Sequence, residues 1–272
     1  MKRKVFAYPY IVWMILFIVV PMFFILYYAV NVGGQFTFAK FWSTITDVKN
    51  NWLVLWNSIV IAFKTTLICL LLAYPIAYIL SNMKKSVAGF ISLLFFVPMW
   101  MNFILRTYSW YAILEYFLPE LLGKPELSFT GTEAAVLMVL VYDFLPFMIL
   151  PLYNTLSKID KSLIEASRDL GANSFSTFMR VVLPLSVPGI VSGITMVFVP
   201  AITTFTVPFI IGNGVFTLYG SKIDEAFHQA TGVAGDYAVG STLSIILVIC
   251  VLISTLIMNY FDKDKESGGK VL

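Results

Sequence analysis

The sequence predicts an all-α, polytopic membrane protein with about six transmembrane helices. Hydrophobic residues make up 59% of the 272 residues and charged residues only 12%, which is about half the charged fraction of an ordinary soluble domain. Six apolar segments are each long enough to cross a hydrocarbon layer of about 30 Å as a helix, which takes about 20 residues. The segments lack the alternating pattern of a membrane β-strand.

The six segments are expected to be helices because an unpaired backbone group costs several kcal/mol in lipid. The first segment follows a short basic stretch, Lys2-Arg3-Lys4, and it is too long for the apolar part of a signal peptide. We therefore interpret it as an uncleaved span. The expected spans cover residues 10–30, 53–80, 88–106, 133–153, 187–211 and 239–260.

Basic residues gather on one side of the expected membrane. With the N-terminus placed inside, the segments 1–9, 81–87, 154–186 and 261–272 hold 12 of the 18 Lys and Arg residues, and the outer loops hold four. Lys and Arg are enriched in cytoplasmic loops, so we expect both termini to be cytoplasmic. The sequence has no long basic run of the kind that binds nucleic acid, so we expect no nucleic-acid partner.

The fifth expected span, residues 187–211, differs from the others in composition. It contains Pro200, Pro208 and four threonines, and it is followed by Gly-Asn-Gly. Proline removes a backbone hydrogen bond and kinks a helix. Broken helices occur at membrane depth where protein or a water-filled cavity covers the freed carbonyls. We interpret this segment as a helix that lines a pathway, and an ordinary proline kink is the alternative.

A polar insert, residues 160–186, separates two expected spans on the cytoplasmic side. Asp160 is a suitable N-cap for a short helix, and Gly171 fits the left-handed position at which such a helix ends. A second helix is expected to start at residue 173 or 174, before two prolines mark the return to the membrane. The insert is thus a compact helix–glycine–helix unit that another protein can contact. A solvated amphipathic loop is the alternative.

The insert also matches a known motif. Glu165-Ala166 is followed by Gly171, then nine residues, an aliphatic residue (Val181), one further residue and Leu183-Pro184. This spacing resembles the EAA motif of ABC importer permeases. Ser167 replaces the third residue of EAA and Val181 replaces Ile. The resemblance implies contact with an ATPase through Glu165, Ala166, Ser167, Arg168, Asp169, Gly171, Leu183 and Pro184. We call residues 160–186 the coupling loop.

The likeness extends beyond the motif. AYPIAYIL (73–80), FFVPMWMNFILRTYSW (95–110) and YDFLPFMILPLYNTLSKIDKSLIEASRDLGA (142–172) resemble the B-type permease subunits of spermidine/putrescine importers. This implies a single transmembrane domain with the type I ABC importer permease (MetI-like) fold in the bacterial inner membrane. The chain would form half of a polyamine pathway. The implied partners, besides membrane lipid, are a C-type permease, a homodimeric ATP-binding subunit and an extracytoplasmic polyamine-binding protein.

The sequence offers no catalytic constellation. Its Gly-Lys pairs, at residues 123–124 and 269–270, lack the glycine spacing and the following Ser or Thr of a phosphate-binding loop. The single histidine, His228, lies in an expected outer loop. We therefore expect no enzymatic activity and no metal or cofactor bound by this chain, while the partner ATPase uses ATP and Mg²⁺.

Candidate cargo contacts follow from the chemistry of a polyamine, a chain of ammonium groups that suits carboxylates, neutral oxygens and aromatic faces. An acid within a span marks a function or a paired network. For Asp143 the alternative is a structural ion pair with Arg106 or Lys64, and for the aromatic residues it is the interfacial belt. The candidates are Asp143, Trp100, Asn102, Tyr108, Trp110, Tyr142, Thr203 and Thr204.

Other transport functions remain open at this stage. An ABC importer permease for another small solute would share every motif above. An ion-coupled secondary transporter needs a coupling-ion site and often has inverted repeats, and a channel needs rings of pore-lining residues in a symmetric oligomer. We find neither pattern in the sequence, and the lack of His and Cys pairs argues against a membrane enzyme.

Overall fold

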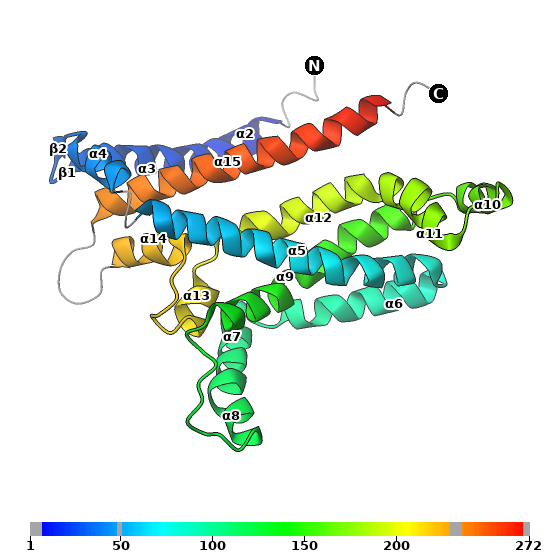
Figure 1. Ribbon diagram of the computed structural model, residues 1–272. Helices are drawn as coiled ribbons and strands as arrows, with labels where there is room; N and C mark the ends of the chain where they lie inside the picture. Colours follow the sequence, from blue (N-terminus) through cyan, green and yellow to red (C-terminus); the bar gives the residue numbers. More distant parts are fainter. Residues whose placement is uncertain (1–6, 48–50, 229–235, 269–272) are drawn as a thin grey trace.

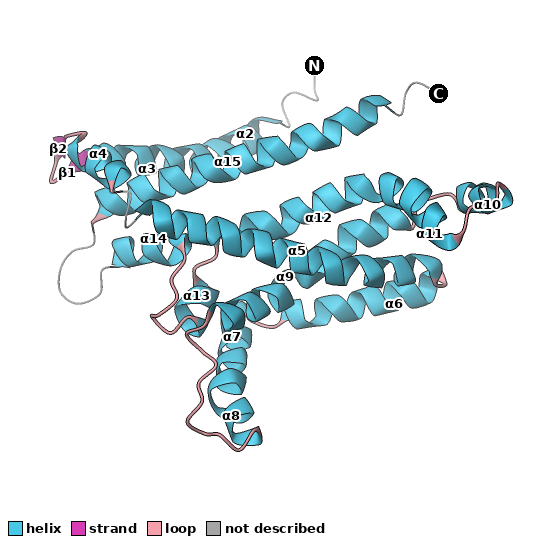
Figure 2. Cartoon of the chain, in the orientation of Figure 1, coloured by secondary structure: helices cyan, strands magenta, loops and turns pink. Residues whose placement is uncertain are grey.

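The computed structural model describes residues 7–47, 51–228 and 236–268. The described chain is almost entirely helical (Figure 2), with one short hairpin formed by β1 (Asn31–Val32) and β2 (Gln35–Phe36). The long helices run side by side (Figure 1). The α10 end of the bundle carries α10 (Lys161–Asp169), and the α14 end carries α4 (Ala39–Thr46) and α14 (Tyr219–His228).

In the described part of the chain, five helices are long and apolar enough to cross a membrane, or six if one bent pair counts as a span. The predicted all-α membrane fold is therefore confirmed. Four of the expected spans are continuous helices close to the expected places. They are α2–η1–α3 (Ala7–Met14, Ile15–Val19, Val20–Val30), α5 (Leu53–Asn82), α9 (Glu133–Leu156) and α15 (Tyr237–Gly268).

The third expected span, residues 88–106, is not one helix. A first part turns by 85° into a second part, which runs to Leu121. Pro98 lies just before the turn, and the Asn102 side chain caps the second part by accepting from the Ile104 N–H at 2.9 Å. The successive elements are α6 (Lys85–Phe96), η3 (Val97–Trp100), α7 (Phe103–Ala112), η4 (Ile113–Phe117) and α8 (Leu118–Leu121).

The fifth span is displaced from its expected place, residues 187–211. One 30-residue helix runs from Ser174 to Thr203 without a stop at Pro184, Pro188 or Pro200. A π turn directly precedes Pro184, and a wide turn of this kind accommodates a residue without an N–H. The helix ends at Thr203, because the Thr204 backbone is extended and a new helix begins only at Thr206. The elements are α11 (Ser174–Thr177), η5 (Phe178–Val182), α12 (Leu183–Thr203) and α13 (Thr206–Ile211).

The core of the bundle lies between α5, α9 and α12. In α9, 67% of the most apolar 18-residue stretch is buried, more than in the corresponding stretch of any other span. Two glycines of α12 face α9, and a Cβ on Gly193 would contact the Met148 sulfur, while one on Gly189 would lie 2.7 Å from Thr155 Oγ1. Small residues at such contacts allow membrane helices to approach closely.

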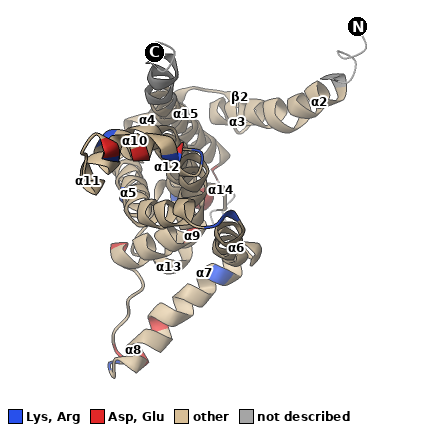
Figure 3. Ribbon diagram, turned by 90° about the vertical axis from the view of Figure 1, so that its right-hand side faces the viewer, with Lys and Arg blue, Asp and Glu red and all other residues tan. Residues whose placement is uncertain are grey.

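The first span stands apart from this core. Helix α3 packs along α15 and buries Ala29, but the most apolar 18-residue stretch of the first span contains no buried residue. Figure 3 shows α2 and α3 to one side of the bundle. Lys40 of α4 joins Asp236 at the start of α15 in an ion pair of 2.9 Å. The described ends of α2 and α15, at Ala7 and Gly268, point toward the α10 end of the bundle (Figure 1).

Candidate coupling site and helix breaks

Hydrogen bonds within the chain close the C-terminal end of α10. Gly171 adopts the left-handed conformation, with φ of +85°. Its N–H donates to the Arg168 carbonyl at 2.8 Å, and the Ala172 N–H donates to the Ser167 carbonyl at 3.1 Å. These two bonds form the Schellman motif. The predicted role of Gly171 as the residue that ends the helix is confirmed.

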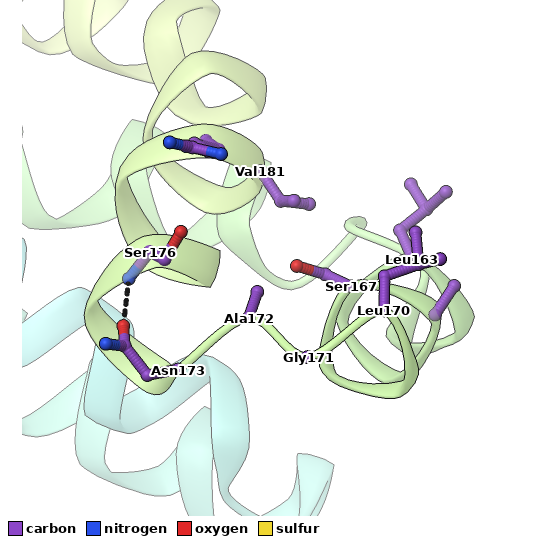
Figure 4. A pocket seen from close by; sticks show the side chains of 10 residues that line it. Leu163, Ser167, Leu170, Gly171, Ala172, Asn173, Ser176 and Val181 are labelled. Atoms are coloured by element: carbon purple, nitrogen blue, oxygen red, sulfur yellow. Dashed lines mark hydrogen bonds between the residues drawn. The ribbon is translucent and has the colours of Figure 1, made fainter.

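Two polar side chains start the helices of the coupling loop. The Asp160 carboxylate accepts from the Ser162 N–H at 3.0 Å, and this hydrogen bonding lowers the pKa of Asp160. Asn173 Oδ1 accepts from the Ser176 N–H at 2.8 Å (Figure 4) and caps α11. Both helix starts were predicted. Because each of these caps is local, the ends of the two helices are closed without distant residues.

An open cavity of about 580 Å³ lies between α10 and α11 (Figure 4). Across it, the hydroxyls of Ser167 and Thr177 lie 3.1 Å apart and hold the two helices together. The wall mixes apolar, hydroxyl and cationic groups and is suited to a protruding part of another protein. It is lined by Leu163, Ala166, Ser167, Leu170, Gly171, Ala172, Asn173, Ser176, Arg180 and Val181.

Most of the residues predicted to contact the ATPase are exposed at this end of the molecule, and the charges of α10 are in front in Figure 3. Ser167 and Leu183 are half-buried and belong to the inner side of the loop. A Cβ on Gly171 would meet no atom within 4 Å. Glycine is therefore favoured here by the backbone angle and not by a lack of space for a side chain. The exposed residues are Glu165, Ala166, Arg168, Asp169, Gly171 and Pro184.

Sequence reasoning missed two apolar residues of the coupling loop. Leu170 is 89% exposed and Leu163 is also exposed, although α10 is otherwise largely polar. Residues seven apart lie on the same face of a helix, so their spacing could have indicated a contact surface. Exposed leucines on a short charged helix are suited to burial against a partner.

The coupling loop is fixed to α5 by aromatic contacts. The Phe178 ring packs edge-to-face on Tyr74 and Tyr78, with ring centroids 5.6 and 6.0 Å apart. The hydroxyls of Tyr74 and Ser186 lie 2.9 Å apart. Ile164 of α10 is half-buried and packs against the core. These contacts connect the coupling loop to the long helices.

Asp143, the acid predicted within a span, is paired. It is 2% exposed on α9, and Arg106 Nε of α7, itself 7% exposed, lies 2.8 Å from its Oδ1. The N–H does not point at the oxygen, so the contact is an ion pair without a well-formed hydrogen bond. Lys64 pairs instead with Glu133 on a more exposed face. The structural ion pair with Arg106 is present, and contact of Asp143 with cargo stays a prediction.

The other cargo candidates do not share one environment. Trp110 and Tyr142 pack edge-to-face with ring centroids 5.2 Å apart, and Tyr142 also faces the Arg106 guanidinium. Trp100 is 80% exposed, and Tyr108 is exposed as well. Asn102 is occupied as the cap of α7. The structure therefore brings Asp143, Tyr142 and Trp110 together.

Thr203 and Thr204 lie at the break between α12 and α13, and α14 covers this break. A Cβ on Gly220 of α14 would lie 2.6 Å from the Thr204 carbonyl oxygen and 2.7 Å from that of Thr203. The Ser221 hydroxyl donates to the Phe205 carbonyl at 3.2 Å. Backbone groups freed by the break are thus covered by the first turn of α14, which the sequence alone did not predict.

Comparisons with known proteins agree with this arrangement. The family model described as "Binding-protein-dependent transport system inner membrane component" matches residues 70–267. The chain is 35% identical to the spermidine/putrescine transport system permease protein PotB of Haemophilus influenzae, with 95% of this chain and 93% of that protein covered. It is 32% identical to PotB of Escherichia coli K12, with 89% and 92% covered.

Solved structures share the fold. A chain of a bacterial alginate ABC transporter, in complex with its alginate pentasaccharide-bound periplasmic protein, superposes with a TM-score of 0.75 at 14% identity, covering 97% of this chain and 96% of that one. A chain of the inward-facing MetNI methionine ABC transporter gives 0.59 at 19% identity, covering 79% and 95%. The predicted type I permease fold is confirmed, and the chain belongs to the family of binding-protein-dependent transport system inner membrane components, the permeases of ABC importers.

Proposed function

We propose that this chain is a permease subunit of an ATP-driven ABC importer and forms half of the translocation pathway for a polyamine such as spermidine or putrescine. ATP hydrolysis takes place on a homodimeric ATP-binding subunit. A C-type permease supplies the other half of the pathway, and an extracytoplasmic binding protein delivers the polyamine. The coupling loop and both termini are cytoplasmic.

The coupling loop is the observation that carries this proposal. Local hydrogen bonds close both ends of α10, and its surface presents exposed leucines between charged residues. The adjoining cavity of about 580 Å³ gives a partner a concave surface to fill. A short helix with capped ends moves as one body, because displacement does not fray it. This is what transmission of force from an ATPase requires.

The path of that force follows from the connectivity. Helix α11 continues through η5 and α12 as one helix from Ser174 to Thr203, about 45 Å long. Its far end is the break at Thr204, which α14 covers. A displacement of the coupling loop therefore reaches the broken part of the fifth span along a single helix. We propose that this break opens and closes the outer end of the pathway.

Support for a polyamine cargo comes from the relatives, whose names specify spermidine and putrescine. The fold does not select the cargo, since structures with the same fold belong to alginate and methionine transporters. Identity of 32–35% over most of the chain favours the cargo of the relatives. An importer permease for another small solute is the second candidate.

ATP-dependent uptake by the assembled complex tests this proposal. The four kinds of subunit are reconstituted in proteoliposomes and supplied with radiolabelled spermidine, putrescine or methionine. We expect uptake of the two polyamines to require ATP, the ATPase and the binding protein, and methionine to remain outside. Uptake of methionine alone would show that the cargo is not a polyamine. Uptake of spermidine by vesicles that contain only this chain would show that the protein is a self-sufficient transporter and not an importer subunit.

A further inference from the structure

We propose that Arg106 holds the 85° bend between α6–η3 and α7, with Asp143 as its counter-ion. We call Arg106, Asp143 and the Pro98 carbonyl the bend clamp. In this proposal Asp143 positions the arm formed by α7, η4 and α8, residues 103–121, and does not contact the cargo. Because the clamp acts on the shape of the chain, the proposal does not depend on which solute is transported.

The Arg106 guanidinium joins the two sides of the bend. Its Nη1 donates to the Pro98 carbonyl at 2.8 Å, and Pro98 belongs to η3, before the turn. Arg106 itself lies one turn into α7, after the turn. Its Nε lies 2.8 Å from Asp143 Oδ1 on α9. The planar guanidinium has donors in several directions, so one side chain contacts three elements that meet at the bend.

The surroundings of the guanidinium favour a fixed cation. Its Cζ lies 5.5 Å from the centroid of the Phe103 ring and 5.8 Å from that of Tyr142, and aromatic faces attract a desolvated cation. The Pro98 carbonyl otherwise accepts only a longer bond in the described part of the chain, from the Met101 N–H at 3.3 Å. Helix ends at membrane depth need such partners because lipid offers none.

Asp143 depends on this arrangement. It is buried on the most buried of the spans. Among the described residues no hydrogen-bond donor is directed at either of its carboxylate oxygens. Its ionised form is therefore balanced chiefly by the charge of Arg106, and loss of either partner leaves a buried, uncompensated charge. A cargo ammonium could reach Asp143 only if the helices around it moved apart.

The bend sets the position of the segment that follows the break of the fifth span. Helix α7 packs against α13. The loop after α8 is tied to the same region, since the Gly131 N–H donates to the Ile211 carbonyl at 2.8 Å. Glu115 of η4 accepts from the Ser128 and Thr130 hydroxyls of this loop at 2.5 and 2.6 Å. A fixed bend therefore holds α13 in place next to the break at Thr204, the break that we propose responds to movement of the coupling loop.

Distance measurements across the bend test the clamp directly. Spin labels are attached at Lys85→Cys on α6 and Glu120→Cys on α8, both exposed, in the full complex with Cys69 and Cys250 replaced by Ala. We expect a narrow distance distribution in this parent and a broad or shifted one in R106K, R106M and D143N. R106K keeps a charge near Asp143 but lacks the planar fork, so it tests the geometry in a variant that keeps the charge balance.

Transport kinetics separate positioning from cargo binding. For R106K and D143N we expect the maximal uptake rate to fall at least about ten-fold while the KM for spermidine stays within about two-fold. The matched control is K64M, which breaks the more exposed Lys64–Glu133 pair between α5 and α9, and it should leave the label distances unchanged. Unchanged distances in R106M and D143N overturn the clamp. A higher KM for D143N with a narrow distribution assigns Asp143 to the cargo instead.

Discussion

The chain stops its helices in two different ways at the two ends of the bundle. At the α10 end, the stop at Gly171 is closed by backbone groups within five residues of each other. Toward the α14 end, the bend after Pro98 and the break at Thr204 are also contacted by residues further along the chain, Arg106 and Gly220 among them. The first kind of stop is complete by itself, whereas the second kind depends on packing.

This difference fits what each region does in the proposed importer. The coupling loop must keep its shape while an ATPase moves it, and local caps keep their geometry wherever the loop goes. The breaks must respond to a displacement that arrives from elsewhere. Besides their local hydrogen bonds, the breaks are contacted by elements further along the chain, so a shift of those elements changes the contacts at the breaks. Variants at each kind of stop can therefore break or sharpen the comparison.

The largest effect is expected at the break covered by α14. In G220V the added side chain meets the carbonyl oxygens of Thr203 and Thr204, and overpacking of this kind costs about 1–3 kcal/mol. Because the cover is non-local, α14 must move away, and the Phe205 carbonyl then loses the hydrogen bond from the Ser221 hydroxyl. We expect lower thermal stability of the complex and loss of most ATP-dependent uptake.

The matched control for this variant is G89V. Gly89 is a helical glycine of α6, and a Cβ there would meet no atom within 4 Å. It should therefore leave stability and uptake near the parent values. Equal losses in G220V and G89V would show that a β-branched residue in a membrane helix, and not the cover of the break, causes the defect.

A smaller and more specific effect is expected at Gly171. In G171A the residue must adopt a φ of +85°, which costs an L-residue roughly 1–2 kcal/mol. The last turn of α10 then frays, so the ATPase turns over without driving uptake. We expect reduced uptake per ATP hydrolysed with the complex intact, and partial recovery in G171N because Asn tolerates this conformation.

Gly123 supplies the control for Gly171. It has a φ of +64° and, like Gly171, open space around its Cβ position, but it lies in the loop after α8. G123A introduces the same kind of strain far from the coupling loop. Uptake per ATP hydrolysed should stay at the parent value, and a decrease equal to that of G171A would contradict the special role of α10.

The same contrast explains what the sequence could predict. The caps at Asp160 and Gly171 and the helix start at Asn173 or Ser174 were predicted because each depends on residues next to it in the chain. The long spans were predicted from apolar length alone. Leu170 escaped notice because a single exposed leucine has no local signature, although its spacing from Leu163 was available.

The breaks could not be placed in the same way. Proline marks several possible stops in the fifth span, and packing decides among them: the helix passes Pro184, Pro188 and Pro200 and ends at Thr203, before Pro208. At the 85° bend, Arg106 meets both Pro98 and Asp143, which lies 37 residues further along the chain. The cover by Gly220 is likewise set by folding and not by neighbours in sequence.

The smallest effect is expected at the Asp160 cap. Its carboxylate accepts from the Ser162 N–H, and this bond lowers the pKa of Asp160. A lowered pKa means that the cap stabilises the folded loop above the ordinary pKa of Asp and that this stabilisation is lost as the pH falls through the lowered value. In D160A the first turn of α10 should exchange its amide hydrogens faster at neutral pH, while uptake stays within about two-fold of the parent because the Schellman end remains.

D160S, which keeps an N-capping oxygen, should restore protection, and S162A, which keeps the N–H, should not alter it. If D160A abolished uptake as completely as G220V, the two ends of α10 would not be independent, and the local character of the coupling loop would have to be abandoned.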